Sequence, residues 1–229
     1  MPRGTMELRR ASRPTRTGDK PLLCKLGRTW IVILLFISAT AAAAQESRAR
    51  EVSYGFSAGY SPYSTELIGS SKDRKLLLVN GEFNVVLLAR KGIALRYTPE
   101  VVFALVHDPK EYLIDDKSKQ VIYSGGGYSV GGGASPLGLQ LNFRDKHRVQ
   151  PYVAGHGGVL YFNKQVPEAA SSQFNFAFSW EGGVEWRARG CNWLRAGYRY
   201  HHLSNDSTGH FNPGIDSNVF LFGWTRRQH

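Results

Sequence analysis

The stretch FNFAFSWEGGVEW, residues 174–186, decides the fold class of this chain. Large apolar side chains at every second position, except at Gly182, alternate with polar, small or charged ones. Successive side chains of a β-strand point to opposite faces, whereas a helix would repeat every 3.6 residues. The stretch is also longer than the strand of an ordinary globular protein, about 5–6 residues. It therefore predicts an amphipathic strand long enough to cross a bilayer at a tilt.

The same alternation recurs along the chain and predicts eight strands. They span 52–60, 77–87, 93–103, 125–143, 148–162, 174–186, 194–204 and 215–225. One face of these strands is apolar and aromatic, and the other carries charges of both signs. The charged residues of the polar face are Glu82, Arg96, Glu100, Glu181, Glu185, Arg187, Arg195 and Arg199.

This pattern predicts an all-β protein, an eight-stranded antiparallel transmembrane β-barrel. The aromatic face would meet lipid, and the charges would pair inside the narrow barrel. A soluble, lipocalin-like barrel would place apolar residues inside and polar residues outside, and the alternation alone permits it. Strand length and the aromatic residues favour the membrane form.

The predicted connections alternate between long and short. They are 61–74, 90–91, 106–124, 144–147, 163–173, 188–190 and 205–214. Outer-membrane barrels place short turns in the periplasm and long loops outside the cell. With the N-terminus in the periplasm, odd-numbered strands run outward, so the seventh strand ends near the external leaflet.

Residues 1–44 have the features of a secretory signal peptide. A long basic segment precedes an apolar core, WIVILLFI at 30–37, and an A-x-A type cleavage site places the cut after Ala44. Translation could start at Met1 or at Met6. We expect residues 45–229 to be a single β-barrel domain, exported to the outer membrane of a Gram-negative-type cell.

The basic character of the chain belongs mostly to this leader. Residues 1–44 contain eight Lys or Arg and two acids, so cleavage lowers the formal net charge from +11 to +5. The charge therefore does not indicate nucleic-acid binding, and the remaining excess suits an anionic lipid surface. The basic loop Ser71–Lys75 is a candidate for contact with lipid phosphates.

Cysteine and histidine spacing predicts neither a disulfide nor a metal site. Cys24 leaves with the leader, so Cys191 has no intramolecular partner. His156, His201 and His210 are conceivable ligands, but His201 faces inward and lacks a suitably spaced partner. We expect no metal and no cofactor.

The segment YRYHHLSNDSTGHFNPGID, residues 198–216, carries candidate chemistry. His202 and Ser204 are two residues apart on a strand and therefore share a face. That face, like the face of Asp216 on the last strand, is the lipid face. A hydroxyl, an imidazole and a carboxylate are the parts of an acyl-transfer triad, and backbone N–H groups of 205–214, with Asn212, are candidate oxyanion donors.

This segment resembles the lipid A 3-O-deacylase family of outer-membrane barrels, the PagL-type or acyloxyacyl hydrolase-like deacylases. The likeness is close over the last thirty residues and looser over the barrel, including the segment 135–143. The matching positions are His202, Ser204, Asn205, Asn212, Gly214, Ile215 and Asp216.

The resemblance implies particular roles for these residues. Ser204 would be the nucleophile, His202 its base and Asp216 the acid that orients the base, with Asn205 and Asn212 in support. The acid in this family is commonly Glu, so the chain departs from the pattern at Asp216. Asp206 is a possible substitute, with a less favourable register.

Two classes of function follow. The first is an outer-membrane esterase that removes the ester-linked 3-position acyl chain of lipid A, with lipopolysaccharide of the outer leaflet as its partner. The second is a non-catalytic barrel with a structural or adhesive role. A soluble lipid-binding barrel ranks third, and the sequence leaves open whether the protein forms a homodimer.

Overall fold

The computed structural model describes residues 51–228 except 115–120, 169–170, 207 and 209–211. The predicted signal peptide, residues 1–44, lies outside this range and stays a prediction. The strands are β1 (Val52–Ser61), β2 (Ser64–Thr65), β3 (Lys75–Arg90), β4 (Ile93–Tyr97), β5 (Glu100–Ile114), β6 (Val121–Phe143), β7 (Val149–Val166), β8 (Ser172–Arg189), β9 (Asn192–Ser204) and β10 (Ile215–Gln228). Over the described ranges, no helix is long and apolar enough to cross a membrane.

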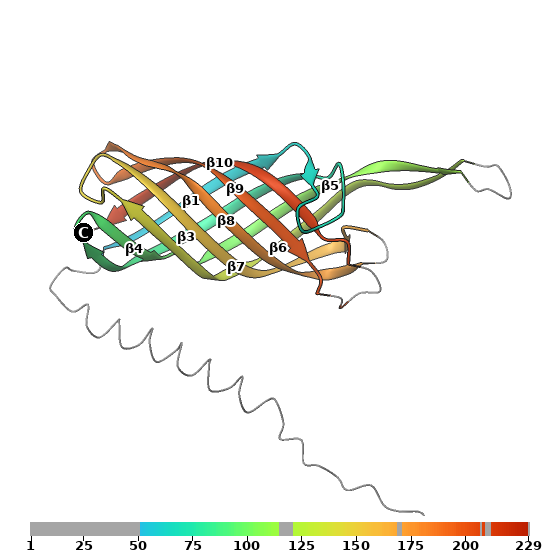
Figure 1. Ribbon diagram of the computed structural model, residues 1–229, viewed down its shortest axis with the longest axis horizontal. Coiled ribbons are helices and arrows are strands. Elements are labelled where there is room, and N and C mark those ends of the chain that lie inside the picture. The colour runs from blue at the N-terminus through green and yellow to red at the C-terminus, as the bar shows by residue number, and fades with distance from the viewer. Residues whose placement is uncertain (1–50, 115–120, 169–170, 207, 209–211, 229) are drawn as a thin grey trace, which may run out of the picture. The chain divides into compact units, whose positions relative to one another are not determined.

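Nine of these segments form eight wall strands, which close into a ring of antiparallel neighbours (Figure 1). β4 and β5 together make one wall strand, interrupted at Thr98 and Pro99, because proline has no N–H to give to the ladder. The ring closes where β1 pairs with β10, for example at Tyr54 and Arg226. β2 is a two-residue strand that pairs with β10. The predicted eight-stranded barrel is confirmed.

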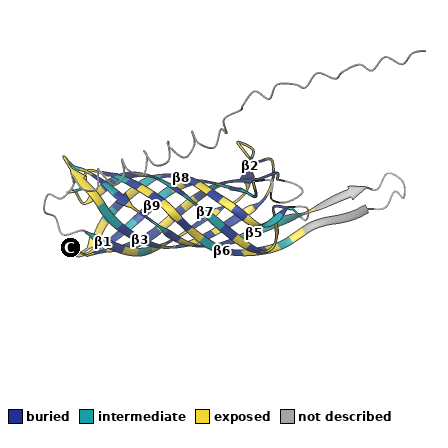
Figure 2. Cartoon of the chain, turned by 90° about the horizontal axis from the view of Figure 1, so that it is seen from below, coloured by how far each residue is buried: buried dark blue, intermediate teal, exposed yellow. Residues whose placement is uncertain are grey.

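The predicted division into an outer and an inner face is also confirmed. Figure 2 shows buried and exposed residues alternating along the wall strands. On the outside, Trp180 is 61% exposed and Phe220 is 66% exposed, whereas the inward-facing Ser57 and Asn175 are fully buried. The lipid-facing surface is therefore apolar and rich in aromatic side chains.

Ion pairs fill the interior towards the end of the barrel that carries the short turns. Arg195 binds both oxygens of Glu82 at 2.8 and 2.7 Å. Arg199 binds Glu181 at 2.7 Å and Glu100 at 2.6 Å. This agrees with the pairing expected for the inward-facing charges. Arg187 is the exception among the predicted members, because it is exposed and its guanidinium lies 5.1 Å from the ring centre of Trp193.

An apolar layer fills the interior near the other end, where β1 and β9 finish, which we call the loop end. Its buried members are Leu76, Leu78, Val102, Ala104, Val106, Leu160, Phe162, Val166, Ala177, Leu203, Ile215, Val219 and Leu221. The sequence did not predict this layer, because the expected interior was polar throughout. The loop end is therefore packed like the core of a globular protein.

The prediction of a loop at 106–124 is wrong. β5 continues to Ile114, and β6 begins at Val121. The two strands stay paired along this whole length, and Ile114 and Val121 form the last pair. Figure 1 shows the paired strands continuing beyond the barrel. A strand outside the bilayer no longer needs a lipid face, so the apolar alternation fades although backbone pairing continues.

Candidate active site

His202 and Asp216 face each other across the β9–β10 pair. β9 ends two residues after His202, and β10 begins one residue before Asp216, so both lie at the loop end. The Nδ1 atom of His202 is 2.6 Å from Oδ1 of Asp216. The His202 side chain is 14% exposed, whereas Asp216 is fully buried. The structure thus brings together two of the three predicted residues and leaves the outer part of the imidazole accessible.

The second oxygen of Asp216 is held by three backbone donors. Oδ2 accepts N–H groups from Leu67 at 2.7 Å, Ile68 at 2.6 Å and Gly69 at 2.9 Å. Consecutive N–H groups that converge on one oxygen form an anion-binding concavity. Together with the imidazole, they favour the ionised form of this carboxyl group.

The loop that supplies these donors, residues 62–74 between β1 and β3, is fixed to the segment before β10. Ser70 N–H donates to the carbonyl of Pro213 at 2.6 Å, and Ser71 N–H donates to that of Gly214 at 3.3 Å. Sequence reasoning missed this contribution, because backbone donors leave no side-chain signature. The one available signal was Gly69: a Cβ at this position would lie 2.8 Å from the carbonyl group of Gly214.

Gly214 also shapes the place of the imidazole. Its φ of +63° lies in the left-handed region, which favours glycine. A Cβ added there would lie 3.1 Å from Cε1 of His202 and 3.2 Å from the carbonyl oxygen of Leu203. The ring of His202 therefore packs against a backbone position that tolerates no side chain without adjustment.

Ser204 is the last residue of β9 and shares the outer face of His202. Its hydroxyl donates to Oδ1 of Asn212 at 3.2 Å and accepts from Nδ2 of the same residue at 2.9 Å. It also accepts the backbone N–H of Asp206 at 3.2 Å. Within the described ranges, the hydroxyl makes no hydrogen bond to His202. The predicted trio is therefore present as a His202–Asp216 pair beside a serine that faces Asn212.

The other predicted positions are placed as follows. Asn205 is fully buried and donates its N–H to Oδ1 of Asn212 at 3.1 Å, so one amide group connects Ser204 and Asn205. Asp206, the alternative acid, is exposed in the turn after β9. Asp216 is the acid that contacts His202.

The outer wall next to the site is aromatic. β8 places Phe178 opposite His202 and Phe176 opposite Ser204, and both rings are exposed. On the other side, Phe220 of β10 makes an edge contact with Tyr198 of β9 at 5.9 Å between ring centres. An extended apolar surface thus leads along the wall away from the serine hydroxyl.

Three buried residues inside the barrel, Glu100, His156 and Glu181, place ligand-type atoms within 4.8 Å of one another. Arg199 binds Glu100 at 2.6 Å and Glu181 at 2.7 Å. The guanidinium therefore already balances the carboxylates that a cation would need. His201 is buried in the interior, and His210 lies outside the described residues.

Comparison with known proteins gives two kinds of match. A family model described as lipid A 3-O-deacylase (PagL) matches residues 107–225, which include His202, Ser204 and Asp216. Among solved structures, the outer membrane enzyme PagL is 15% identical with a TM-score of 0.51, over 76% of this chain and 97% of that chain. At that identity the structural likeness shows the fold alone.

Two other solved barrels also align. Neisserial surface protein A is 13% identical with a TM-score of 0.45, over 78% of this chain and 99% of that chain. The attachment invasion locus protein Ail of Yersinia pestis is 12% identical with a TM-score of 0.43, over 79% of this chain and 100% of that chain. A comparison with curated proteins finds no match.

Proposed function

Because the chain belongs to the lipid A 3-O-deacylase (PagL) family, we propose that it is an outer-membrane esterase that hydrolyses the 3-position acyl ester of lipid A. The observation that carries this proposal is the 2.6 Å contact between His202 and Asp216, with Ser204 two residues along the same strand face. An imidazole oriented by a carboxylate, with a hydroxyl on the same strand face, supplies the groups that acyl transfer needs.

Ser204 is the nucleophile in the proposed reaction. Nε2 of His202 takes the hydroxyl proton while Oγ bonds to the ester carbonyl carbon. The bond from that carbon to the sugar 3-oxygen then breaks, and His202 gives the proton to the departing oxygen. Water cleaves the acyl-enzyme by the same route and releases the fatty acid. Asp216 keeps a proton on Nδ1 and balances the imidazolium charge throughout.

The resting hydrogen bonds of Ser204 assign a role to Asn212. For reaction, the hydroxyl turns from Asn212 towards His202, as catalytic hydrogen bonds often tighten only once substrate is bound. The freed Nδ2 of Asn212 and the N–H of Asp206, now 2.9 and 3.2 Å from Oγ, are then available to the oxyanion. One such donor is typically worth about 10²–10³ in rate. Asn205 supports them by holding Oδ1 of Asn212.

The position of the site on the outer wall supports a lipid substrate. The exposed rings of Phe176 and Phe178 lie opposite Ser204 and His202 and offer an apolar surface to an acyl chain. Long connections at this end suit the extracellular side, where lipopolysaccharide occupies the outer leaflet. A lipid ester could thus meet the serine without leaving the bilayer.

Mass spectrometry of lipid A from cells with and without the expressed protein tests this function. Wild-type protein is expected to remove the 3-position ester-linked chain, and Ser204→Ala is expected to leave lipid A unmodified. If Ser204→Ala protein still released this chain at the wild-type rate, the esterase proposal would fail. A non-catalytic barrel predicts unmodified lipid A with every variant.

Ser172→Ala is the matched control, because it removes a serine hydroxyl at the same end of the barrel but outside the proposed site. Ser172 is the half-buried first residue of β8, and its hydroxyl accepts the N–H of Phe174, two residues further along the strand. This variant should modify lipid A like wild type.

A further inference from the structure

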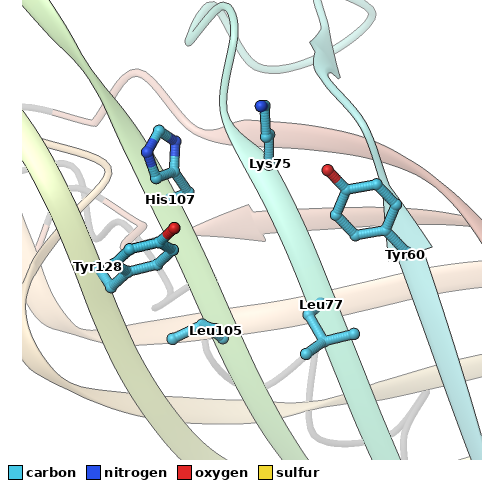
Figure 3. Close-up of a pocket in the computed structure, with 6 residues that line it drawn as sticks. All are labelled: Tyr60, Lys75, Leu77, Leu105, His107 and Tyr128. Atoms are coloured by element: carbon cyan, nitrogen blue, oxygen red, sulfur yellow. The ribbon is translucent and has the colours of Figure 1, made fainter.

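A pocket of about 210 Å³ opens on the outer wall over β1, β3, β5 and β6. Its lining residues are Tyr60, Lys75, Leu77, Leu105, His107 and Tyr128. Figure 3 shows Lys75 and His107 at one end of this pocket and Leu77 and Leu105 at the other. The proposed reaction uses none of these side chains.

Strand register builds the pocket from two adjacent rows. In the first row, Lys75 pairs with His107, which pairs in turn with Tyr128. In the second row, two residues further into the barrel wall, Tyr60 pairs with Leu77, and Leu77 pairs with Leu105. Residues two apart on a strand share a face, so all these side chains project outwards. A basic and aromatic row thus lies directly above an apolar one.

The charge of Lys75 is not balanced by the acidic side chains nearby. Asp108, the acid next in sequence to the first row, is bound by Arg74 at 2.9 Å. Glu66 is paired with Lys72 at 3.1 Å. Over the part of the chain that the structure describes, Lys75 makes no ion pair and its side chain is exposed. An ammonium group therefore stands free above an apolar surface.

His107 is the second polar group of the pocket. Its ring meets that of Tyr128 edge to face, with 4.9 Å between ring centres, and this contact fixes the imidazole beside Lys75. Its Nδ1 atom is buried and has no hydrogen-bond partner among the described residues, so this atom is not open to a ligand. The imidazole therefore contributes to the pocket through the rest of its ring, beside the ammonium group of Lys75.

We propose that this pocket binds one outer-leaflet lipid with a phosphate in its headgroup. The phosphate lies against Lys75 and His107, and the acyl chain begins on Leu77 and Leu105. Lysine is a common phosphate ligand, and a basic residue near an anionic membrane surface is worth about 1 kcal/mol. A free anion would use only the first row. The apolar row below it, which continues down β3 to the exposed Val79, favours a lipid.

This site is separate from the proposed reaction centre and does not rest on the proposed function. Ser204 is on β9 and Lys75 is on β3, with β10 and β1 between them. At about 4.8 Å per strand, the two sites are roughly 14 Å apart around the wall. The two sites are therefore separated on the outer wall by two strands.

Native mass spectrometry of the full barrel in nonionic detergent tests the proposal, with dioleoyl phosphatidic acid and dioleoylglycerol as probes. The two lipids differ by the phosphate. We expect wild-type protein to retain phosphatidic acid more tightly, and Lys75→Gln to weaken that binding about fivefold, the factor that corresponds to about 1 kcal/mol. Binding of dioleoylglycerol should not change in Lys75→Gln. Leu77→Asn should weaken both lipids.

Lys72→Gln is the matched control, because Lys72 is close in sequence but already paired with Glu66. It should bind phosphatidic acid like wild type. Equal retention of the two probes by wild-type protein, or equal retention of phosphatidic acid by wild type and Lys75→Gln, would overturn the proposal. Displacement of phosphatidic acid by an equal concentration of inorganic phosphate would also overturn it, in favour of a free-anion site. These readouts do not depend on hydrolysis, so they separate this site from the esterase.

Discussion

Replacing Asp216 with asparagine gives the sharpest test of the His202–Asp216 pair. The carboxylate uses one oxygen for Nδ1 of His202 and the other for three backbone N–H groups of Leu67, Ile68 and Gly69. An asparagine can keep its oxygen on the three N–H groups only by turning its NH2 group towards His202. Nδ1 must then accept a hydrogen bond, which moves the ring proton to Nε2. The imidazole in that tautomer cannot take the proton of Ser204.

The size of the effect follows from these contacts. Loss of the correct tautomer in a Ser-His-Asp arrangement lowers kcat by about 10⁴. The fold should suffer much less, because three hydrogen bonds to a charged acceptor become bonds to a neutral one, at about 1 kcal/mol each. The total loss of stabilisation is roughly 3 kcal/mol, and it weakens the binding of the 62–74 loop to β10. The backbone pairing of the barrel wall is unchanged. We therefore expect an assembled but nearly inactive barrel.

The assay is the initial rate of fatty acid release from purified lipid A, with heat-modifiable migration on gels as the check of assembly. Asp206→Asn makes the same chemical change on an exposed acid outside the pair and should keep a rate close to wild type. Asp216→Glu should retain more activity than Asp216→Asn, because it keeps the carboxylate. It should stay below wild type, because the three backbone donors already enclose the shorter side chain.

The opposite pattern of activities would contradict the assignment of Asp216. If Asp206→Asn abolished release while Asp216→Asn kept the wild-type rate, the third member of the site would be misassigned. If Asp216→Asn failed to assemble, the carboxylate would be needed for the wall itself, and its contribution would not be confined to the 62–74 loop.

Four further outcomes are expected. His202→Ala and Ser204→Ala should each abolish release, and the double variant should be little worse than either, because the residues act as a unit; additive losses in rate assays would contradict this. Asn212→Ala should lower kcat by about 10²–10³ through loss of an oxyanion donor, and a change in KM alone would argue against that role. Gly214→Ala should cost about 1–2 kcal/mol from its left-handed backbone and lower the rate about tenfold, measured beside thermal unfolding. The mature protein should fractionate with outer membranes and migrate heat-modifiably, since a closed barrel pairs its backbone throughout; recovery as a soluble protein would contradict the membrane assignment.

Much of the wall was predictable because lipid and a narrow lumen impose opposite demands on alternate residues. Trp180 and Glu181 are neighbours in sequence, yet one is 61% exposed and the other 5% exposed. The same parity placed His202 and Asp216 on one face, and antiparallel pairing then set them opposite each other. The alternation of apolar and polar residues is thus sufficient to predict which way a side chain faces, wherever each face of the strand has a single environment.

The features that the sequence did not reveal are those that do not depend on the alternation of apolar and polar side chains. The N–H groups of Leu67, Ile68 and Gly69 hold Asp216 through the backbone, so side-chain identity carries no trace of the contact. The β5–β6 hairpin continues beyond the barrel, where nothing requires an apolar face. The inner layer around Phe162 is apolar although it faces the lumen, because close packing can fill that space as well as ion pairs can.

The lumen is filled by a layer of ion pairs and by an apolar layer, and both affect whether solutes can cross the membrane through this protein. Arg199 and Glu181 at one level, and Leu78 and Phe162 at the other, have at most 5% of their surface accessible to water. Side chains packed this closely obstruct small solutes and ions as well as water. Cells that produce the protein in quantity should therefore show no increase in uptake of small hydrophilic antibiotics. In the proposed reaction, the water that completes hydrolysis would therefore reach Ser204 from outside the barrel and not through its lumen.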